Sequence, residues 1–195
     1  MRIFIALDID AAIRERIELF MNGVRGFAPD ARWVNAASLH VTLKFIGEKP
    51  IEIVEQIKSG LVQVRAEPIE ITFGGYGFFP TAKAVRVFWV GIKAGPQLAD
   101  LASKVDDITK PLGVPEENRA FSPHLTLARG GSGSGAPGRR KDDRANKVFM
   151  RLQEKLAALP DPQFGNITAR EFFLYQSQLQ RGGARYTKIA RFPLS

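Results

Sequence analysis

The chain has 195 residues, 45% of them apolar and 25% charged, which is enough to bury a core of its own. It has no cysteine, which excludes disulfides, zinc thiolates and cysteine nucleophiles and fits a cytoplasmic location. No apolar run reaches the roughly 18 residues of a membrane span, so we expect no membrane contact. The formal net charge of +8 favours an anionic partner, most commonly nucleic acid, although it also fits a basic protein without one.

Apolar spacing predicts a mixture of strands and helices in chain order. Alternating β-branched and aromatic residues indicate strands, and apolar residues spaced by three or four indicate helices. The predicted order is strand 2–8, helix 11–24, strand 32–34, strand 38–46, helix 50–64, strand 68–79, strand 84–93, helix 96–110, strand 121–128, helix 144–159, strand 164–175 and strand 185–193. The turn-like residues 79–83 predict that the strands on either side form a hairpin.

One segment has the composition of a loop. Residues 130–146 read GGSGSGAPGRRKDDRAN, which is rich in glycine and serine and then in charge. Glycine- and serine-rich chain is flexible, so we expect an exposed, flexible loop over residues 130–143. Its basic residues are diluted by two aspartates, which favours a solvated loop over an anion-binding patch.

An internal repeat relates the two halves of the chain. RIF at residues 2–4 matches RVF at 86–88, and SLHVTL at 38–43 matches SPHLTL at 122–127, both with an offset of 84. The second pair of segments holds the only two histidines, His40 and His124. We therefore predict one domain over residues 1–195, with approximate repeats 1–79 and 84–175.

The repeated His-x-Thr pattern indicates acid–base chemistry on an anion. Side chains alternate along a strand, so His40 and Thr42 share one face, as do His124 and Thr126. An imidazole accepts or donates a proton near neutral pH, and a threonine hydroxyl donates a hydrogen bond. Two such units facing each other suit displacement at phosphorus. A metal site is disfavoured because no third ligand has suitable spacing.

The motifs HVTL (40–43) and HLTL (124–127) resemble the two HxTx motifs of the 2H phosphoesterase superfamily. Within it, the chain is most similar to the RNA 2′,3′-cyclic phosphodiesterases, historically called 2′-5′ RNA ligases. The similarity extends to RIFIALDI near the N-terminus, GYGFFP and RVFWVGI in the centre, and FFLYQSQL near the C-terminus. It implies an α+β fold of two pseudo-symmetric lobes of antiparallel sheet, with flanking helices around a central cleft.

The resemblance also implies roles. His40 would be the proton donor, His124 the proton acceptor, and Thr42 and Thr126 would hold the phosphate. The implied reaction opens a terminal 2′,3′-cyclic phosphate to a 2′-phosphomonoester without metal or cofactor. A reversible 2′-5′ RNA ligase activity, which joins a cyclic end to a 5′ hydroxyl, is also implied. The implied partners are RNA with such ends or small cyclic nucleotides, bound by a monomer. A binding module without turnover is the alternative, although both histidines are present.

Further residues are candidates for substrate contact. Arg129 is expected to bind phosphate, provided that a bulge near Ala128 turns it toward His124. Lys44 has the same parity as His40 and Thr42, so it either lines the cleft or is a surface lysine. Aromatic side chains can stack on unpaired bases or belong to the core. Phe79 and Tyr76 are the main stacking candidates, followed by Phe78, Tyr175 and Tyr186.

Overall fold

The structure is a computed structural model that describes residues 1–81, 85–117, 120–130, 147–180 and 183–195. Within these ranges the strands are β1 (Arg2–Leu7), β2 (Arg32–Trp33), β3 (Val41–Glu48), β4 (Ile69–Phe79), β5 (Val87–Ala94), β6 (His124–Arg129), β7 (Gln163–Ala169), β8 (Glu171–Gln180) and β9 (Gly183–Pro193). The α-helices are α1 (Ala11–Val24), α2 (Ile51–Leu61), α3 (Pro96–Thr109) and α5 (Met150–Ala157). Short 3₁₀ helices are η1 (Arg25–Phe27), η2 (Ala36–Ser38) and η3 (Lys110–Leu112).

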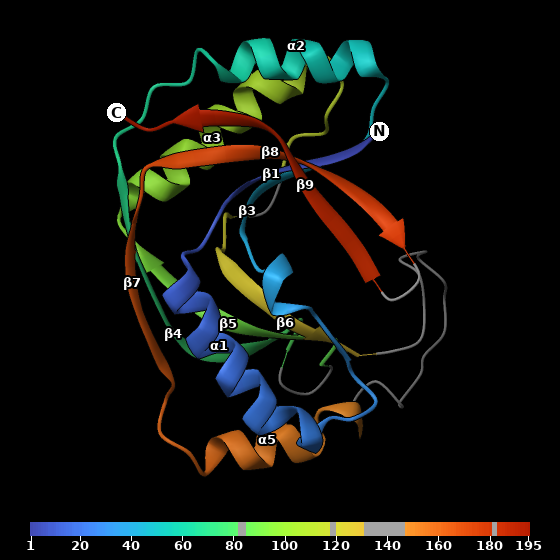
Figure 1. Ribbon diagram of the computed structural model, residues 1–195, viewed down its shortest axis with the longest axis vertical. Helices are drawn as coiled ribbons and strands as arrows, with labels where there is room; N and C mark the ends of the chain where they lie inside the picture. The colour runs from blue at the N-terminus through green and yellow to red at the C-terminus, as the bar shows by residue number, and fades with distance from the viewer. Residues whose placement is uncertain (82–84, 118–119, 131–146, 181–182) are drawn as a thin grey trace.

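The strands form two antiparallel sheets, one above the other in Figure 1. The upper sheet has the order β3-β1-β8-β9 and the lower sheet the order β2-β6-β5-β4-β7. β4 and β5 pair along most of their length, as the hairpin prediction requires. The predicted α+β fold with two antiparallel lobes and flanking helices is confirmed.

Local sequence explains where the helices begin. The carboxylate of Asp10 accepts a hydrogen bond from the backbone nitrogen of Ile13 at 2.8 Å, which caps the first turn of α1. Pro96 occupies the start of α3, where its missing N–H costs nothing. The helices predicted at 11–24 and 96–110 therefore agree with α1 and α3 to within one residue.

Each sheet is covered by a helix that follows a strand of the other sheet (Figure 1). α1 follows β1 of the upper sheet but packs on the lower one, where the Phe20 ring lies 5.3 Å from the Phe164 ring. On the same helix Arg16 donates to the carbonyl oxygen of Phe164 at 2.8 Å. α3 follows β5 of the lower sheet but packs on β3 of the upper one, through an ion pair between Asp106 and Lys44. This exchange ties the two sheets into one unit.

The main core is continuous across both sheets and the helices that cover them. It contains fully buried side chains such as Phe73, Phe88 and Ile57. Burial of one such side chain is worth about 1.5–3 kcal/mol. A second, smaller cluster lies on the opposite face of the upper sheet, and its members are Phe4, Ala6, Phe173 and Tyr175. This smaller cluster forms the floor beneath the first histidine.

Several predicted boundaries are wrong; for example, the strands predicted at 84–93 and 121–128 begin at Val87 and His124. The strand predicted over 164–175 is two strands, because the chain leaves the lower sheet at Ala169 and enters the upper sheet at Glu171. The strand predicted from residue 38 begins at Val41, because residues 36–38 form η2, whose Asn35 cap accepts a hydrogen bond from the backbone nitrogen of Ala37. The second helix ends at Leu61 rather than at residue 64.

Two predictions extend beyond the described residues. The helix predicted at 144–159 is described from residue 147, with α5 as its main part. The loop predicted at 130–143 lies outside the described residues except for Gly130.

Candidate active site

His40 and His124 stand at matching points of matching strands. His40 immediately precedes β3 and His124 is the first residue of β6. β3 pairs with β1 in the upper sheet and β6 pairs with β5 in the lower sheet. Residues of β3 and β6 come within 8 Å of each other at Cα, so the two motifs meet where the sheets meet.

Both imidazoles are oriented by equivalent hydrogen bonds to the backbone. Nδ1 of His40 lies 2.7 Å from the carbonyl oxygen of Ser38, and Nδ1 of His124 lies 2.8 Å from that of Ser122. A carbonyl oxygen only accepts, so Nδ1 carries the proton in each neutral ring. Nε2 is then the nitrogen left to accept or donate a proton. The serine of the repeated Ser-x-His pattern thus acts through its backbone.

A β-bulge changes the direction of β3 just after Thr42. Thr42 pairs with Ala6 and Lys44 with Ile5, so Leu43 is the extra residue. After an extra residue, strict alternation no longer predicts the face. Phe45 consequently lies on the same face as Thr42, and Lys44 turns to the opposite face.

The same bulge occurs in β6. Thr126 pairs with Trp89 and Ala128 with Phe88, so Leu127 is the extra residue. Arg129 therefore lies on the same face as Thr126, while Ala128 is fully buried. The bulge near Ala128 that the Arg129 prediction required is present, at Leu127.

Both alternatives for Lys44, a place in the cleft or on the surface, are wrong. Its side chain is 7% exposed, forms an ion pair with Asp106 of α3 and donates to the carbonyl oxygen of Pro115 at 2.7 Å. The parity argument failed because it assumed an unbroken strand. Lys44 joins the upper sheet to α3 instead.

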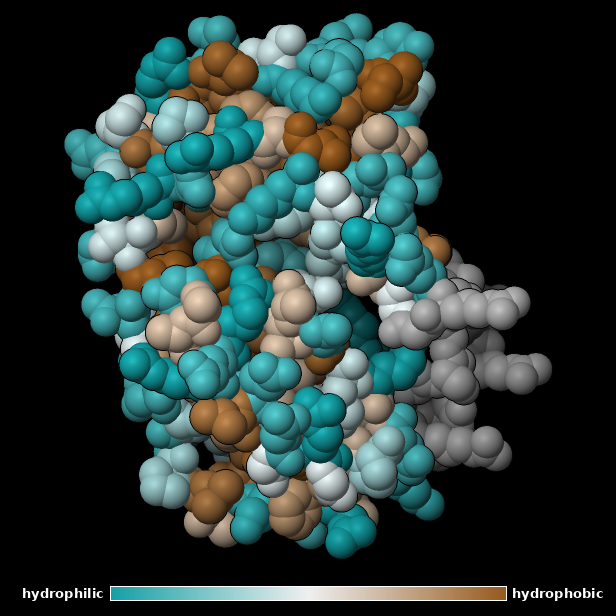
Figure 2. All heavy atoms as spheres, viewed as in Figure 1, coloured by the Kyte–Doolittle hydropathy of each residue, from teal (hydrophilic) through white to brown (hydrophobic). Residues whose placement is uncertain are grey.

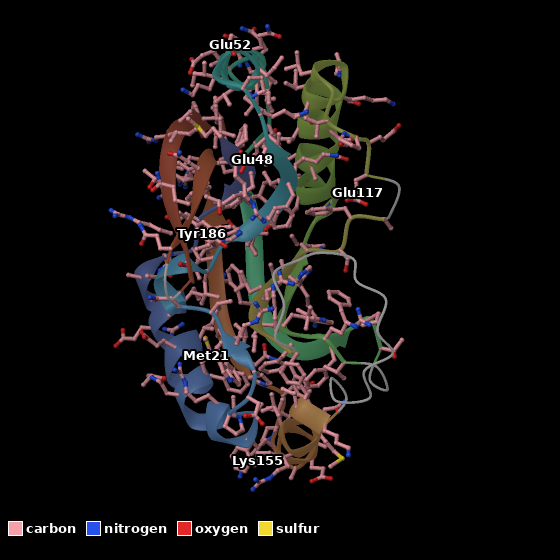
Figure 3. All side chains as sticks on the ribbon, turned by 90° about the vertical axis from the view of Figure 1, so that its right-hand side faces the viewer. Met21, Glu48, Glu52, Glu117, Lys155 and Tyr186 are labelled. Carbon is pink, nitrogen blue, oxygen red and sulfur yellow. The ribbon has the colours of Figure 1, made fainter. Side chains whose placement is uncertain are left out.

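The two motifs line one cleft with a volume of about 560 Å³. Figure 2 shows a recess at mid-height between the upper and lower halves, beside the grey segments. Tyr186, labelled in Figure 3, lies at this level on β9. The residues that line the cleft are Trp33, Val34, Asn35, Ala37, Ser38, Leu39, His40, Thr42, Phe45, Ser122, His124, Thr126, Arg129, Gln180, Gly183, Ala184, Arg185 and Tyr186.

Comparison with known proteins agrees with this geometry. The sequence matches the model of the 2′-5′ RNA ligase superfamily over residues 12–164. The chain belongs to the 2′-5′ RNA ligase superfamily. It is 31% identical to an RNA 2′,3′-cyclic phosphodiesterase of Archaeoglobus fulgidus over 98% of this chain and 99% of the relative. It is 30% identical to one of Escherichia coli, over 100% of this chain and 97% of the relative.

Solved structures agree as well. A crystal structure described as a phosphoesterase superposes with a TM-score of 0.78 at 29% identity, covering 100% of this chain and 98% of the other. Escherichia coli LigT in complex with 3′-AMP superposes with a TM-score of 0.77 at 29% identity, again covering 100% and 98%. Superfamily membership and fold are therefore established for this chain by sequence and by structure.

In this superfamily member His40 lies among aromatic rings. The Phe4 ring is 4.6 Å from the imidazole, and the Tyr186 ring meets it edge-on at 5.2 Å. Burial lowers the pKa of His40 below its usual value of 6.5, and the bond to Ser38 and the charge of Asp8 oppose this only in part. The His40 ring is therefore mostly neutral at pH 7 in the free protein.

The second histidine has different neighbours. The Phe79 ring meets His124 edge-on at 4.9 Å, and the Trp89 ring lies 6.2 Å away. Trp89 fits there because Gly77 has no side chain, as a Cβ on Gly77 would lie 2.1 Å from its ring. Phe79 thus packs beside the site as a neighbour of the imidazole and is not among the cleft-lining residues.

Other stacking candidates are distributed differently. Tyr76 packs against Phe78 and Phe88 on the core face of β4 and is not among the cleft-lining residues. Tyr175 stacks on Phe4 beneath the first histidine. Tyr186 does line the cleft. The exposed aromatic ring in the cleft is that of Phe45, which strict alternation from Thr42 would place on the opposite face because it does not include the bulge at Leu43.

A second residue missed from the sequence supports the segment before His40. Arg14 of α1 donates to the carbonyl oxygens of Ala36 at 2.7 Å, Leu39 at 3.2 Å and Ile9 at 3.1 Å. It also pairs with Asp8 at 2.8 Å. Through these bonds α1 fixes η2, whose Ser38 carbonyl orients the imidazole.

The described part of the chain shows no grouping of three or more His, Asp or Glu side chains that would hold a metal ion. Among the helices of these same ranges, none is both long and apolar enough to cross a bilayer.

Proposed function

We propose that the protein is an RNA 2′,3′-cyclic phosphodiesterase that opens a terminal cyclic phosphate to a 2′-phosphomonoester. The observation that carries this proposal is that both His-x-Thr units line one cleft, with each Nδ1 bonded to a backbone carbonyl. The relatives named RNA 2′,3′-cyclic phosphodiesterase and the nucleotide-bound LigT structure support the same activity and a nucleotide substrate.

The mechanism uses one imidazole on each side of the phosphorus. Nε2 of His124 takes a proton from water, and the water oxygen bonds to phosphorus. The bond from phosphorus to the ribose 3′ oxygen breaks, and Nε2 of protonated His40 gives that oxygen its proton. Thr42 and Thr126 donate to the non-bridging oxygens, and Arg129 supplies positive charge.

Burial of His40 is compatible with the donor role. A histidine with a lowered pKa holds its proton less firmly, so it is a stronger acid once protonated. The anionic phosphate of a bound substrate favours the protonated ring. Ligation follows the same course with a 5′ hydroxyl in place of water: its oxygen bonds to phosphorus, the bond to the ribose 3′ oxygen breaks, and a 2′-5′ linkage remains; cleavage of that linkage back to the cyclic phosphate is the reverse. We keep this reversibility, the monomeric state and the cytoplasmic location as predictions.

The test is hydrolysis of a nucleoside 2′,3′-cyclic phosphate in the presence of a chelator. We expect a 2′-phosphate as product, and a loss of at least about 10²-fold in rate for His40→Ala and for His124→Ala. Equal rates for parent and both variants would contradict the proposal. Tight binding of cyclic nucleotides by the parent without any turnover would favour the binding module instead.

The donor and acceptor roles need a separate test. When sulfur replaces the 3′ oxygen of the substrate, the leaving group departs as a thiolate and needs no proton donor. On this substrate His40→Ala should regain most of the parental rate, while His124→Ala should stay slow. If only His124→Ala regained its rate, His124 would be the proton donor and His40 the proton acceptor.

A further inference from the structure

Phe45 is exposed inside a cleft. Its side chain is 63% exposed although it lines the same cleft as His40 and Thr42. The other aromatic rings of the cleft are half-buried: Trp33 donates from Nε1 to the Ala28 carbonyl oxygen at 3.0 Å, and Tyr186 packs edge-on against His40. A ligand that covered this ring would remove apolar surface from water, which is favourable.

The repeat gives Phe45 a counterpart of opposite character. Phe45 and Arg129 are related by the offset of 84 that relates the two motifs. Both reach the cleft because a bulge precedes each of them, at Leu43 and at Leu127. The cleft is thus symmetric at its histidines and threonines, but one wall then presents an aromatic ring and the other a guanidinium.

The separation between Thr42 and Phe45 fits the length of one nucleoside. Because Leu43 is an extra residue, Thr42 and Phe45 pair with Ala6 and Phe4, which are two residues apart, or about 7 Å along a strand. That span is comparable with the reach from a phosphate held at Thr42 to the base of the same nucleotide. The ring is supported from one side by Phe4, whose centroid is 5.9 Å away and which is 2% exposed. Gln180 and Arg185 of the same cleft supply polar groups.

We propose that Phe45 is the stacking platform for the base of the nucleotide that carries the cyclic phosphate. The proposal rests on the function proposed above. It assigns the terminal base to the upper sheet and the anionic side of the phosphate to Arg129 of the lower sheet. The broken symmetry then fixes which way the substrate enters a cleft whose catalytic groups alone would accept it in two directions.

The experiment compares two substrates that differ only in the base. Adenosine 2′,3′-cyclic phosphate and ribose 2′,3′-cyclic phosphate are hydrolysed by the parent, Phe45→Ala, Phe45→Tyr and Phe45→Leu. Base stacking on an aromatic ring is worth about 5- to 150-fold in binding. We expect Phe45→Ala and Phe45→Leu to lower the adenosine-to-ribose ratio of kcat/KM by at least about fivefold, mainly through KM. Phe45→Tyr should keep the parental ratio.

Leu19→Ala serves as the matched control, because Leu19 is also exposed (67%) but belongs to α1, away from the cleft. It should keep the parental ratio of the two substrates. An unchanged ratio in Phe45→Ala, or equal losses on both substrates, overturns the proposal.

A binding measurement separates the two proposals. Dissociation constants of adenosine 2′-phosphate and ribose 2-phosphate are measured for the parent and Phe45→Ala. A parent that binds both but hydrolyses neither cyclic substrate contradicts the proposed function only. Selective loss of adenosine 2′-phosphate binding in Phe45→Ala still supports the platform, and its absence overturns it.

Discussion

Nδ1 of His40 lies 2.7 Å from the carbonyl oxygen of Ser38, which leaves Nε2 as the nitrogen that exchanges protons. His124 and Ser122 repeat this relationship. Nδ1 therefore anchors each ring and Nε2 transfers the proton. Substitution of a histidine by alanine removes both functions at once.

Replacement of His40 by asparagine should keep the anchor and abolish the chemistry. The amide nitrogen of asparagine takes the place of Nδ1 and donates to the Ser38 carbonyl, but no group replaces Nε2. We expect a loss of at least about 10²-fold in kcat for His40→Asn, with a melting temperature close to that of the parent. Measurement of kcat and of thermal unfolding checks this. Near-parental kcat would show that Nε2 is not the reacting nitrogen.

The pH dependence of kcat/KM should reveal the burial of His40. The donor must be protonated in the free enzyme, and burial lowers its pKa below 6.5, so kcat/KM should already fall as pH rises from below 6.5. In kcat the same limb should lie at higher pH, because the bound anionic phosphate favours the protonated ring. Rate profiles between pH 5 and 9 test both limbs. A kcat/KM limb centred above pH 6.5 would contradict the assignment of His40 as the donor.

Removal of the Lys44 side chain should reduce stability and spare activity. Lys44→Ala leaves the Asp106 carboxylate, which is 19% exposed, without its cation. The loss of one partner of a buried pair costs about 3 kcal/mol in the free energy of unfolding, the lower end of the usual range because Asp106 retains some water. Urea unfolding measures this. The double variant Lys44→Met with Asp106→Leu should recover most of the loss, and kcat should stay near parental in both.

Arg14 should act as a positioning residue for His40. Arg14→Met removes the bonds that fix η2 and Leu39, so the imidazole is less well placed. Small misplacements of reacting groups are costly, and we expect kcat to fall by at least about tenfold with KM within about threefold. Arg16→Met is the control, because Arg16 donates a hydrogen bond to the carbonyl oxygen of Phe164 in the lower sheet. It should lower stability only. Equal effects of the two variants on kcat would leave Arg14 a purely structural role.

The sequence correctly predicted that both His-x-Thr units share one cleft. Two histidines in repeated motifs are a local signal, and local spacing sufficed to put His40 and Thr42 on one face, and His124 and Thr126 on one face. The offset of 84 also holds for Phe45 and Arg129. Whether this likeness reflects an internal duplication stays an interpretation.

The β-bulges, the break between β7 and β8 and the contacts of Arg14 could not be predicted from local spacing. An extra residue at Leu43 reverses the parity of Lys44 and Phe45, so Lys44 packs against α3 and lies neither in the cleft nor on the surface, the two places that the sequence suggested. The break at Arg170 was missed because both neighbouring strands are rich in β-branched and aromatic residues. Arg14 was missed because its partners are backbone carbonyls, which every residue type supplies.

The central claim is that both histidines act on one phosphate, and nitrogen NMR of the imidazoles tests it most directly. Adenosine 2′-phosphate is titrated into the parent while the Nε2 signals of His40 and His124 are followed. We predict that both signals shift together, with one midpoint and a stoichiometry of one ligand per chain. A shift of only one signal, or two separate midpoints, would contradict the claim.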